Sequence, residues 1–318
     1  LTIKAVDDAK FVTLNDVAGY AGVTYSGFVN NETSSVLASA PTIQRSNATV
    51  NAAGTYAGVL EPSGASATNY AISYVNGDYT IVPADELLVR VNAATTTYGT
   101  DATYNIASAQ YFSSALNTVV TLAAPSLASG VYTVNDGVGG TAQFTLAPED
   151  AMYSTSGRLS TGGYDLTTGA VLVSSANFND AVHVVGSVHV GRKSVAPVIS
   201  GVSKVYDGNA EMTNLVVAMN GHLPVDDVSI AGVGFLNNKN VGTSKAFTVS
   251  DLALSGVDAS NYYISTGSST TGTTGAVSQK ELTVSGIVAS DRTYDGTIDA
   301  TVSTAGVLYD GLVAGDNF

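Results

Sequence analysis

Two copies of one short motif constrain the fold of this chain more than any other feature. The stretch KVYDGN occupies residues 204–209 and returns as RTYDGT at 292–297, with Tyr206 and Tyr294 separated by 88 residues. An alternating apolar run precedes each copy, which predicts a strand that ends in a turn. A fixed period of tens of residues indicates an array of similar units. We therefore expect tandem modules instead of one large domain.

Further landmarks extend the repeat to the whole chain. Similar module starts occur as LTIKAVDDAKFV at residue 1 and LLVRVNAATTTYG at residue 87. The first three modules also close on an Asn–aromatic pair, and these pairs are Asn69–Tyr70, Asn177–Phe178 and Asn261–Tyr262. Together the landmarks predict β-rich modules over 1–84, 85–194, 195–280 and 281–318. We expect the fourth to be a truncated start that continues in a longer array.

The second module is longer than the first. Gly130–Tyr132 is taken as the counterpart of Gly54–Tyr56. Tyr132 then lies 46 residues before Phe178, whereas Tyr56 lies 14 residues before Tyr70. This difference predicts an insertion near 136–169. Because that segment breaks the repeat, it is where a specialised site is most expected.

Composition favours an all-β or mainly β fold. Apolar residues make up 45% of the chain and charged residues only 12%, while Gly is abundant with 33 residues. Frequent Val, Thr, Ser and Tyr are typical of short strands and turns. We predict tandem modules in an elongated array, each with its own core and a modest interface to the next. A sandwich and a β-grasp-like sheet both fit each module.

Charge and cysteine content exclude several classes of function. The net charge of −14, without any cluster of Lys or Arg, opposes binding to nucleic acid. The absence of cysteine excludes disulfides, a thiolate nucleophile and a Cys-ligated zinc site. No run of about 18 apolar residues is present, so we expect no membrane insertion by this segment. The start, LTIKAVDDAK, lacks signal-peptide features, so any targeting signal is expected elsewhere.

Local patterns predict hairpins and one bulge. Asn76–Gly77 is the preferred pair of a type I′ turn, and Gly186–Ser187 is expected to form the same turn in the second module. With that register, His183 and His189 face opposite sides and cannot share a metal. A change of alternation predicts a bulge near Ser250–Asp251.

Two further segments carry local predictions. A helix and a strand both remain open for 111–122, because a 3.6-residue apolar spacing there runs into a β-branched stretch. In the strand before the first Tyr-Asp-Gly, Val205 is expected to be buried and Lys204 exposed.

The Tyr-Asp-Gly copies are best interpreted as structural turns. The glycines suit a positive φ, and the aspartates suit caps on nearby backbone N–H groups. A catalytic interpretation has no convergent third group, and we assign no catalytic, cofactor-binding or metal-binding residue and no enzymatic activity. The structural landmarks of the two copies are Tyr206, Asp207, Gly208, Tyr294, Asp295 and Gly296.

These segments resemble known repeats. VYDGN followed by NNKNVGTSKAFTVSDLALSGVDASNYYIS resembles a YDG repeat, and TYDGT with GLVAGDNF resembles the first half of another. NAAGTYAG and ATNYAISYVNGDYTIV, within 1–83, resemble the related MBG repeat, from which the second module diverges. Such repeats occur in large bacterial exoproteins of the filamentous haemagglutinin type, secreted through an outer-membrane partner. The resemblance implies an extracellular location, at the cell surface or in a biofilm matrix.

Two functional hypotheses follow. In the first, the chain is a stalk or spacer of an adhesin, whose immediate partners are further repeats of the same parent chain. In the second, the insertion binds polysaccharide or host or matrix glycans through Tyr153, Arg158 and Tyr164. No cofactor is expected. Structural calcium is kept as a minor alternative, because aspartates such as Asp226–Asp227 are available but no calcium-loop motif is present.

Overall fold

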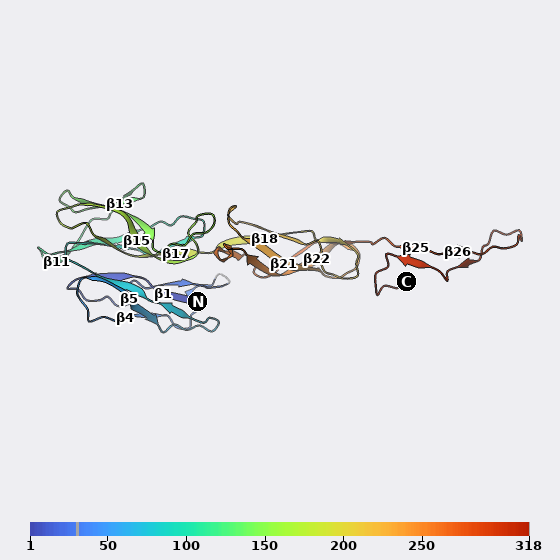
Figure 1. Cartoon of the computed structure of the whole chain (residues 1–318), viewed down its shortest axis with the longest axis horizontal. Coiled ribbons are helices and arrows are strands. Elements are labelled where there is room, and N and C mark those ends of the chain that lie inside the picture. Colours follow the sequence, from blue (N-terminus) through green and yellow to red (C-terminus); the bar gives the residue numbers. More distant parts are fainter. Residues whose placement is uncertain (30–31, 318) are drawn as a thin grey trace. The chain divides into compact units, whose positions relative to one another are not determined.

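The computed structural model describes residues 1–29 and 32–317, and nearly all of its regular structure is β-strand (Figure 1). The helical elements among these residues are two 3₁₀ turns, Ser34–Val36 and Ala259–Asn261. This confirms the mainly β prediction. No helix in the described ranges is long and apolar enough to span a bilayer. Contacts group the chain into two compact units, the first comprising 1–194, 222–227 and 257–263, and the second the remainder.

Module one contains two sheets. Its strands are β1 (Thr2–Ala5), β2 (Asp8–Phe11), β3 (Val23–Ser26), β4 (Thr42–Arg45), β5 (Gly54–Ser63), β6 (Ser73–Val75) and β7 (Gly77–Val82). The sheet orders are β3-β1-β6 and β2-β7-β5-β4. The opening strand is broken into β1 and β2, and the closing strand into β6 and β7. Each opening half pairs in parallel with a closing half, β1 with β6 and β2 with β7.

Module two repeats this plan with more strands. They are β8 (Leu87–Val91), β9 (Ala94–Thr97), β10 (Ile106–Ser113), β11 (Thr118–Thr121), β12 (Ser126–Ala128), β13 (Val131–Asn135), β14 (Thr141–Pro148), β15 (Gly162–Ser174), β16 (Val182–Val185) and β17 (Ser187–Gly191). The sheet orders are β11-β10-β8-β16 and β12-β13-β14-β15-β17-β9. Again β8 pairs in parallel with β16, and β9 with β17. The ambiguous segment 111–122 forms strands, not a helix.

Module three has the same broken opening and closing strands. It contains β18 (Lys193–Ser200), β19 (Ser203–Val205), β20 (Val216–Asn220), β21 (Ser229–Leu236), β22 (Gly242–Ser255), β23 (Tyr262–Ile264) and β24 (Thr270–Ser278), in sheets ordered β20-β18-β23 and β19-β24-β22-β21. Asp251 has a φ of +54°, and the β21–β22 register shifts opposite it, which confirms the expected bulge.

Module four consists of two short antiparallel ladders. β25 (Thr283–Ser285) pairs with β28 (Leu308–Asp310), and β26 (Val288–Ala289) pairs with β27 (Val302–Ser303). The described residues of these strands are exposed. An opening strand in two pieces is thus present here as well.

The expected hairpins at Asn76–Gly77 and Gly186–Ser187 do not form. At both places the closing strand passes from one sheet to the other, because β6 and β7, like β16 and β17, pair with different strands. A Cβ on Gly77 would lie 2.7 Å from the carbonyl oxygen of Ala5, and one on Gly186 would lie 2.7 Å from Cβ of Val91. The glycines therefore permit two strands to cross closely, and they are not needed for a turn.

Modules one and two share part of their core. Ala9, Phe11 and Val82 of the first module cluster with Leu88, Phe112 and Val185 of the second. Figure 1 shows the blue strands of module one beside the green strands of module two. Separate cores with a modest interface were expected. Module one does have a cluster of its own, Ala5, Leu60, Tyr79 and Ile81, but the expectation is wrong in that a second cluster is shared with module two. The reason is that β2 and β8 present apolar side chains on the faces that meet between the two modules, so burying them together removes more apolar surface from water.

The first two modules run in opposite directions. Leu88, at the start of β8, packs in the cluster with Phe11, at the end of β2, while Arg90 further along β8 pairs with Asp8 at the start of β2. The chain therefore folds back between them, and the predicted elongated array does not hold for this pair of modules. Lys4 of β1 also pairs with Asp165 of β15, with Nζ 2.6 Å from Oδ2.

The extra strands of module two precede β15. Gly162 and Gly54 have similar φ values, 151° and 145°, and each begins the strand beside the closing strand. The Tyr164 hydroxyl donates to the carbonyl of the residue four positions earlier, as the Tyr56 hydroxyl does. Tyr164 lies 14 residues before Phe178, the same distance as from Tyr56 to the first-module aromatic. The counterpart of Gly54–Tyr56 is therefore Gly162–Tyr164, and the insertion lies upstream of it.

Candidate functional site

The first Tyr-Asp-Gly turn encloses a buried lysine. Nζ of Lys204 lies 2.7 Å from Oδ1 of Asp207 and donates to Oδ1 of Asn209 at 2.9 Å and to the carbonyl of Glu211 at 2.6 Å. The Lys204 side chain is only 4% exposed, whereas Val205 is exposed. The expected orientation of this strand is therefore wrong, because the turn supplies oxygens that satisfy a buried ammonium group.

The second copy makes similar contacts with a less buried arginine. The Arg292 guanidinium pairs with Asp295 at 3.0 Å and donates to Oγ1 of Thr297 at 2.9 Å. In both copies the aspartate accepts from the backbone N–H two residues later, at 3.2 Å in the first and 3.0 Å in the second. Gly208 and Gly296 have φ values of +86° and +81°. The turn-and-cap interpretation of the motif is confirmed.

Both aspartates of the motif are held in their ionised form. The hydrogen bond from Lys204 lowers the pKa of Asp207, and the backbone N–H of Thr297 lowers the pKa of Asp295. The Tyr206 hydroxyl donates to Asp316 at 2.9 Å, while Tyr294 is exposed. These groups are engaged in local structure, and the arrangement gives no acid–base pair across a cleft.

The aromatic residues of the Asn–aromatic landmarks pack against other rings. Tyr70 meets Phe28 at a centroid distance of 5.5 Å, Phe178 meets Tyr111 at 5.6 Å and Tyr262 meets Tyr98 at 5.3 Å. The asparagines differ: Asn261 is buried and accepts from the Thr161 N–H, Asn177 is half-buried, and Asn69 is exposed. The repeated element is therefore the ring, which anchors the end of each module.

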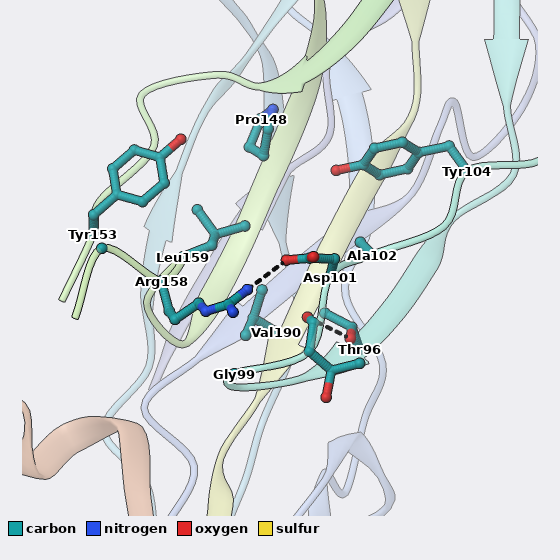
Figure 2. Close-up of a pocket in the computed structure, with 12 residues that line it drawn as sticks. Thr96, Gly99, Asp101, Ala102, Tyr104, Pro148, Tyr153, Arg158, Leu159 and Val190 are labelled. Carbon is teal, nitrogen blue, oxygen red and sulfur yellow. Dashed lines mark hydrogen bonds and ion pairs between the residues drawn. The ribbon is translucent and has the colours of Figure 1, made fainter. Parts of the chain in front are cut away.

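The structure brings two of the three candidate ligand contacts together. Tyr153 and Arg158 line a cavity of about 250 Å³, which we call the module-two pocket (Figure 2). Tyr164 does not line the pocket. Its side chain is buried, and its hydroxyl donates to the Ser160 carbonyl. The other residues that line the pocket are Thr96, Gly99, Thr100, Asp101, Ala102, Tyr104, Pro148, Gly157, Leu159 and Val190.

Buried tyrosines position the two walls of this pocket. The hydroxyl of Tyr98, a fully buried side chain, donates to Oδ2 of Asp226 at 2.5 Å, and Oγ of Ser154 hydrogen-bonds to the same hydroxyl at 2.6 Å, which fixes the loop that carries Tyr153. The Tyr132 hydroxyl donates to the carbonyl of Tyr104 at 2.8 Å, which fixes the opposite wall. No sequence pattern marked Tyr104 or Asp101 as pocket residues, although the Tyr-Gly-Thr stretch at 98–100, which stands where other modules have Tyr-Asp-Gly, leads directly into this segment.

A second polar cluster lies where modules one and two meet. The backbone N–H of Asp7 donates to Oδ1 of Asp165 at 3.3 Å, and the N–H of Asp78 donates to Oδ1 of Asp7 at 2.7 Å. Burial, reinforced by the charge of Asp165, raises the pKa of Asp7 to about 7. This carboxyl group can therefore exchange a proton near neutral pH.

The histidines do not form a metal pair. Nε2 of His183 lies 2.7 Å from Oε2 of Glu86, and His189 lies on β17 in the other sheet of the module. Among residues 1–29 and 32–317, no group of three or more His, Asp or Glu side chains is arranged to hold a metal ion.

Comparisons with known proteins identify two of the modules. A family model for the MBG domain (YGX type) matches residues 1–80, and a family model for the YDG domain matches residues 191–272. No curated protein and no solved structure matches the chain. Domains of these two types fit adhesin-like repeat segments and are typically non-catalytic. The chain therefore carries YDG/MBG-type repeats, with an MBG domain as its first module and a YDG domain as its third.

Proposed function

We propose that this chain is a force-transmitting structural segment of a secreted bacterial adhesin, which projects a binding region from the cell surface or into a biofilm matrix. Its immediate partners are further repeats of the same parent protein. One observation carries the proposal: in the first three modules, halves of the opening strand lie beside halves of the closing strand. The paired strands β1–β6, β2–β7, β8–β16, β9–β17 and β19–β24 are all parallel.

This strand arrangement suits a module under tension. When the opening and closing strands are parallel neighbours, the chain enters a module at one end and leaves it at the other. Pulling on the two ends then slides these strands past each other, so the hydrogen bonds of the ladder are loaded together. Antiparallel terminal strands would be peeled apart one bond at a time. Forced unfolding depends on the unfolding rate, which shear loading keeps low.

The surface chemistry is compatible with a spacer. The net charge of −14 keeps the chain soluble, and the low share of charged side chains leaves a surface rich in Thr and Ser. The acidic and basic side chains of the repeat motif are satisfied within the modules themselves. A passive structural role and the absence of catalysis are both part of the proposal.

Single-molecule force spectroscopy tests the mechanical role. The chain has no cysteine, so two introduced cysteines define the points of attachment. Ser194→Cys with Ser278→Cys loads module three from the start of β18 to the end of β24. Val205→Cys with Ser278→Cys pulls on directly paired residues of β19 and β24 and peels them apart. We expect clearly higher rupture forces for the first pair, and equal forces would contradict the proposal.

Labelling intact cells with antibodies tests the location. Antibodies raised against the purified chain should stain unpermeabilised cells of the bacterium that produces it, or the matrix around them. Staining that requires permeabilisation would overturn the proposed extracellular location.

A further inference from the structure

We propose that the module-two pocket binds one residue of a neutral saccharide. This inference goes beyond the spacer role and does not depend on it. Most of the pocket's lining comes from the loop after β9 and the loop between β14 and β15, and the strand residues Thr96, Pro148 and Val190 complete it. Module one has no counterpart of β12 and β13, the extra strands of this sheet.

Two tyrosines face the pocket from opposite sides. Figure 2 shows the rings of Tyr104 and Tyr153 on either side of Pro148, with both hydroxyls directed toward the space between them. Tyr153 is 62% exposed, and Tyr104 is half-buried. Neither hydroxyl hydrogen-bonds to any residue that the structure describes. Tyrosine offers an apolar face for the C–H side of a sugar ring and a hydroxyl for its polar edge.

An ion pair supplies the polar side of the pocket. Nη1 of Arg158 donates to Oδ1 of Asp101 at 2.9 Å. The Asp101 side chain is 91% exposed, so its other oxygen is open to a ligand, and Arg158 has further N–H groups to donate. A carboxylate that accepts and a guanidinium that donates together match two neighbouring sugar hydroxyls. Hydrogen bonds to charged groups are stronger than those between neutral groups.

Charge favours a neutral ligand over an anionic one. Within the pocket, the charge of Arg158 is balanced by Asp101. The net charge of the whole chain is −14, which repels acidic sugars and phosphates. The cavity of about 250 Å³ is open to solvent and is small for a larger cofactor.

The pocket is held in place before any ligand arrives. The loop with Tyr153 is closed by a hydrogen bond from the Ser154 N–H to the Arg158 carbonyl at 2.9 Å, and by the Tyr98 hydroxyl on Ser154. Tyr104 is fixed through its carbonyl by Tyr132. Less conformational freedom is then lost on binding, which favours a measurable affinity even for a single sugar.

Ligand-observed NMR tests the proposal. The whole chain is mixed with the methyl glycosides of glucose, galactose, mannose and N-acetylglucosamine, each at about 10 mM, a range suited to millimolar dissociation constants. Sodium glucuronate serves as the anionic probe. We expect saturation transfer from the protein to at least one neutral glycoside and none to glucuronate.

Four variants locate the binding. Tyr153→Ala should abolish the transfer, Tyr153→Phe should keep most of it, and Asp101→Asn should weaken the affinity about tenfold through the lost charge-assisted bond. Tyr294→Ala removes an exposed tyrosine of module four and should change nothing. Each side chain changed is exposed, and melting curves check that the variants remain folded.

Three results would overturn the site. They are no transfer to any neutral glycoside, equal transfer to wild type and Tyr153→Ala, and transfer to glucuronate alone. None of them bears on the force measurements with module three, so failure of the saccharide site is distinguishable from failure of the proposed structural role.

Discussion

Arg90 of the second module places Nη1 at 2.8 Å from Oδ1 of Asp8 in the first, where the Asp8 side chain is only 3% exposed. Its Nη2 also donates to the carbonyl of Ala9. Asp8 is the first residue of β2, which pairs with β7. The contact therefore joins the second module to the β2–β7 ladder of the first. The two modules are thus coupled by charge as well as by their shared apolar cluster.

Removing Arg90 should destabilise the pair of modules. Arg90→Ala leaves a buried carboxylate without its partner, and we expect a loss of about 2 kcal/mol in the free energy of unfolding, less than for a fully buried pair because Arg90 is partly exposed. Urea denaturation measures this loss. Arg158→Ala, which breaks an exposed ion pair, is the matched control and should cost about 0.5 kcal/mol or less. Equal losses in the two variants would show that the Arg90 contact does not couple the modules.

Stability should fall as the pH rises toward neutrality. The pKa of Asp7 is about 7 in the folded chain and 3.8 as its ordinary value, so the folded state binds a proton more tightly than the unfolded state. This contribution is fully present below about pH 4 and is lost as the pH rises to 7. The charged groups around Asp7 are Lys4, Asp78, Glu149 and Asp165.

Asp7→Asn isolates this effect. An amide keeps an oxygen for the Asp78 N–H but carries no charge, so the variant should melt a few degrees higher than wild type at pH 8 and should lose part of the pH dependence. Melting temperatures between pH 5 and pH 8 provide the measurement. Asp101→Asn, on an exposed side chain, should leave the slope unchanged. If the melting temperature of Asp7→Asn changes with pH as steeply as that of wild type, a group other than Asp7 causes the pH dependence.

Gly77 should not tolerate a side chain. In Gly77→Ala the new Cβ would meet the Ala5 carbonyl oxygen at 2.7 Å, so one of the crossing strands must shift. We expect a loss of about 2 kcal/mol or more in the free energy of unfolding. Gly191→Ala is the control, because its nearest atom outside the adjoining residues lies at 3.6 Å, and it should change stability by about 0.5 kcal/mol or less. If Gly77→Ala unfolds like wild type, the close crossing is not what requires the glycine.

The lysine of the first Tyr-Asp-Gly turn should accept arginine but not alanine. Lys204→Ala removes the ammonium group that Asp207, Asn209 and Glu211 surround, and it should destabilise module three by about 2 kcal/mol. Lys204→Arg should cost less, because Arg292 pairs with Asp295 and Thr297, the counterparts of Asp207 and Asn209, in the second copy. Hydrogen exchange at the β19–β24 ladder reports the change locally. Equal exchange in Lys204→Ala and wild type would argue against the enclosed lysine as a stabilising feature.

Local chemistry was predictable wherever neighbouring residues decide it. The positive φ of Gly208, the cap made by Asp207 and the bulge at Asp251 follow from side chains and backbone within a few residues. The orientation of Lys204 was not predictable in this way, because alternation assigns lysine to solvent unless a turn returns oxygens to its ammonium group. The wall of the candidate pocket that carries Tyr104 was missed, since Tyr104 and Tyr153 are 49 residues apart in the chain.

By itself the sequence determined the tandem repetition, the mainly β fold and the Tyr-Asp-Gly turns, because period, composition and turn residues act over short distances. Only the tertiary structure decided that the closing strands change sheets at Gly77 and Gly186, and that the first two modules share a core around Phe11 and Leu88. Period-two alternation records which side chains are buried, but not the strand or module against which they are buried. That choice depends on contacts between residues far apart in the chain.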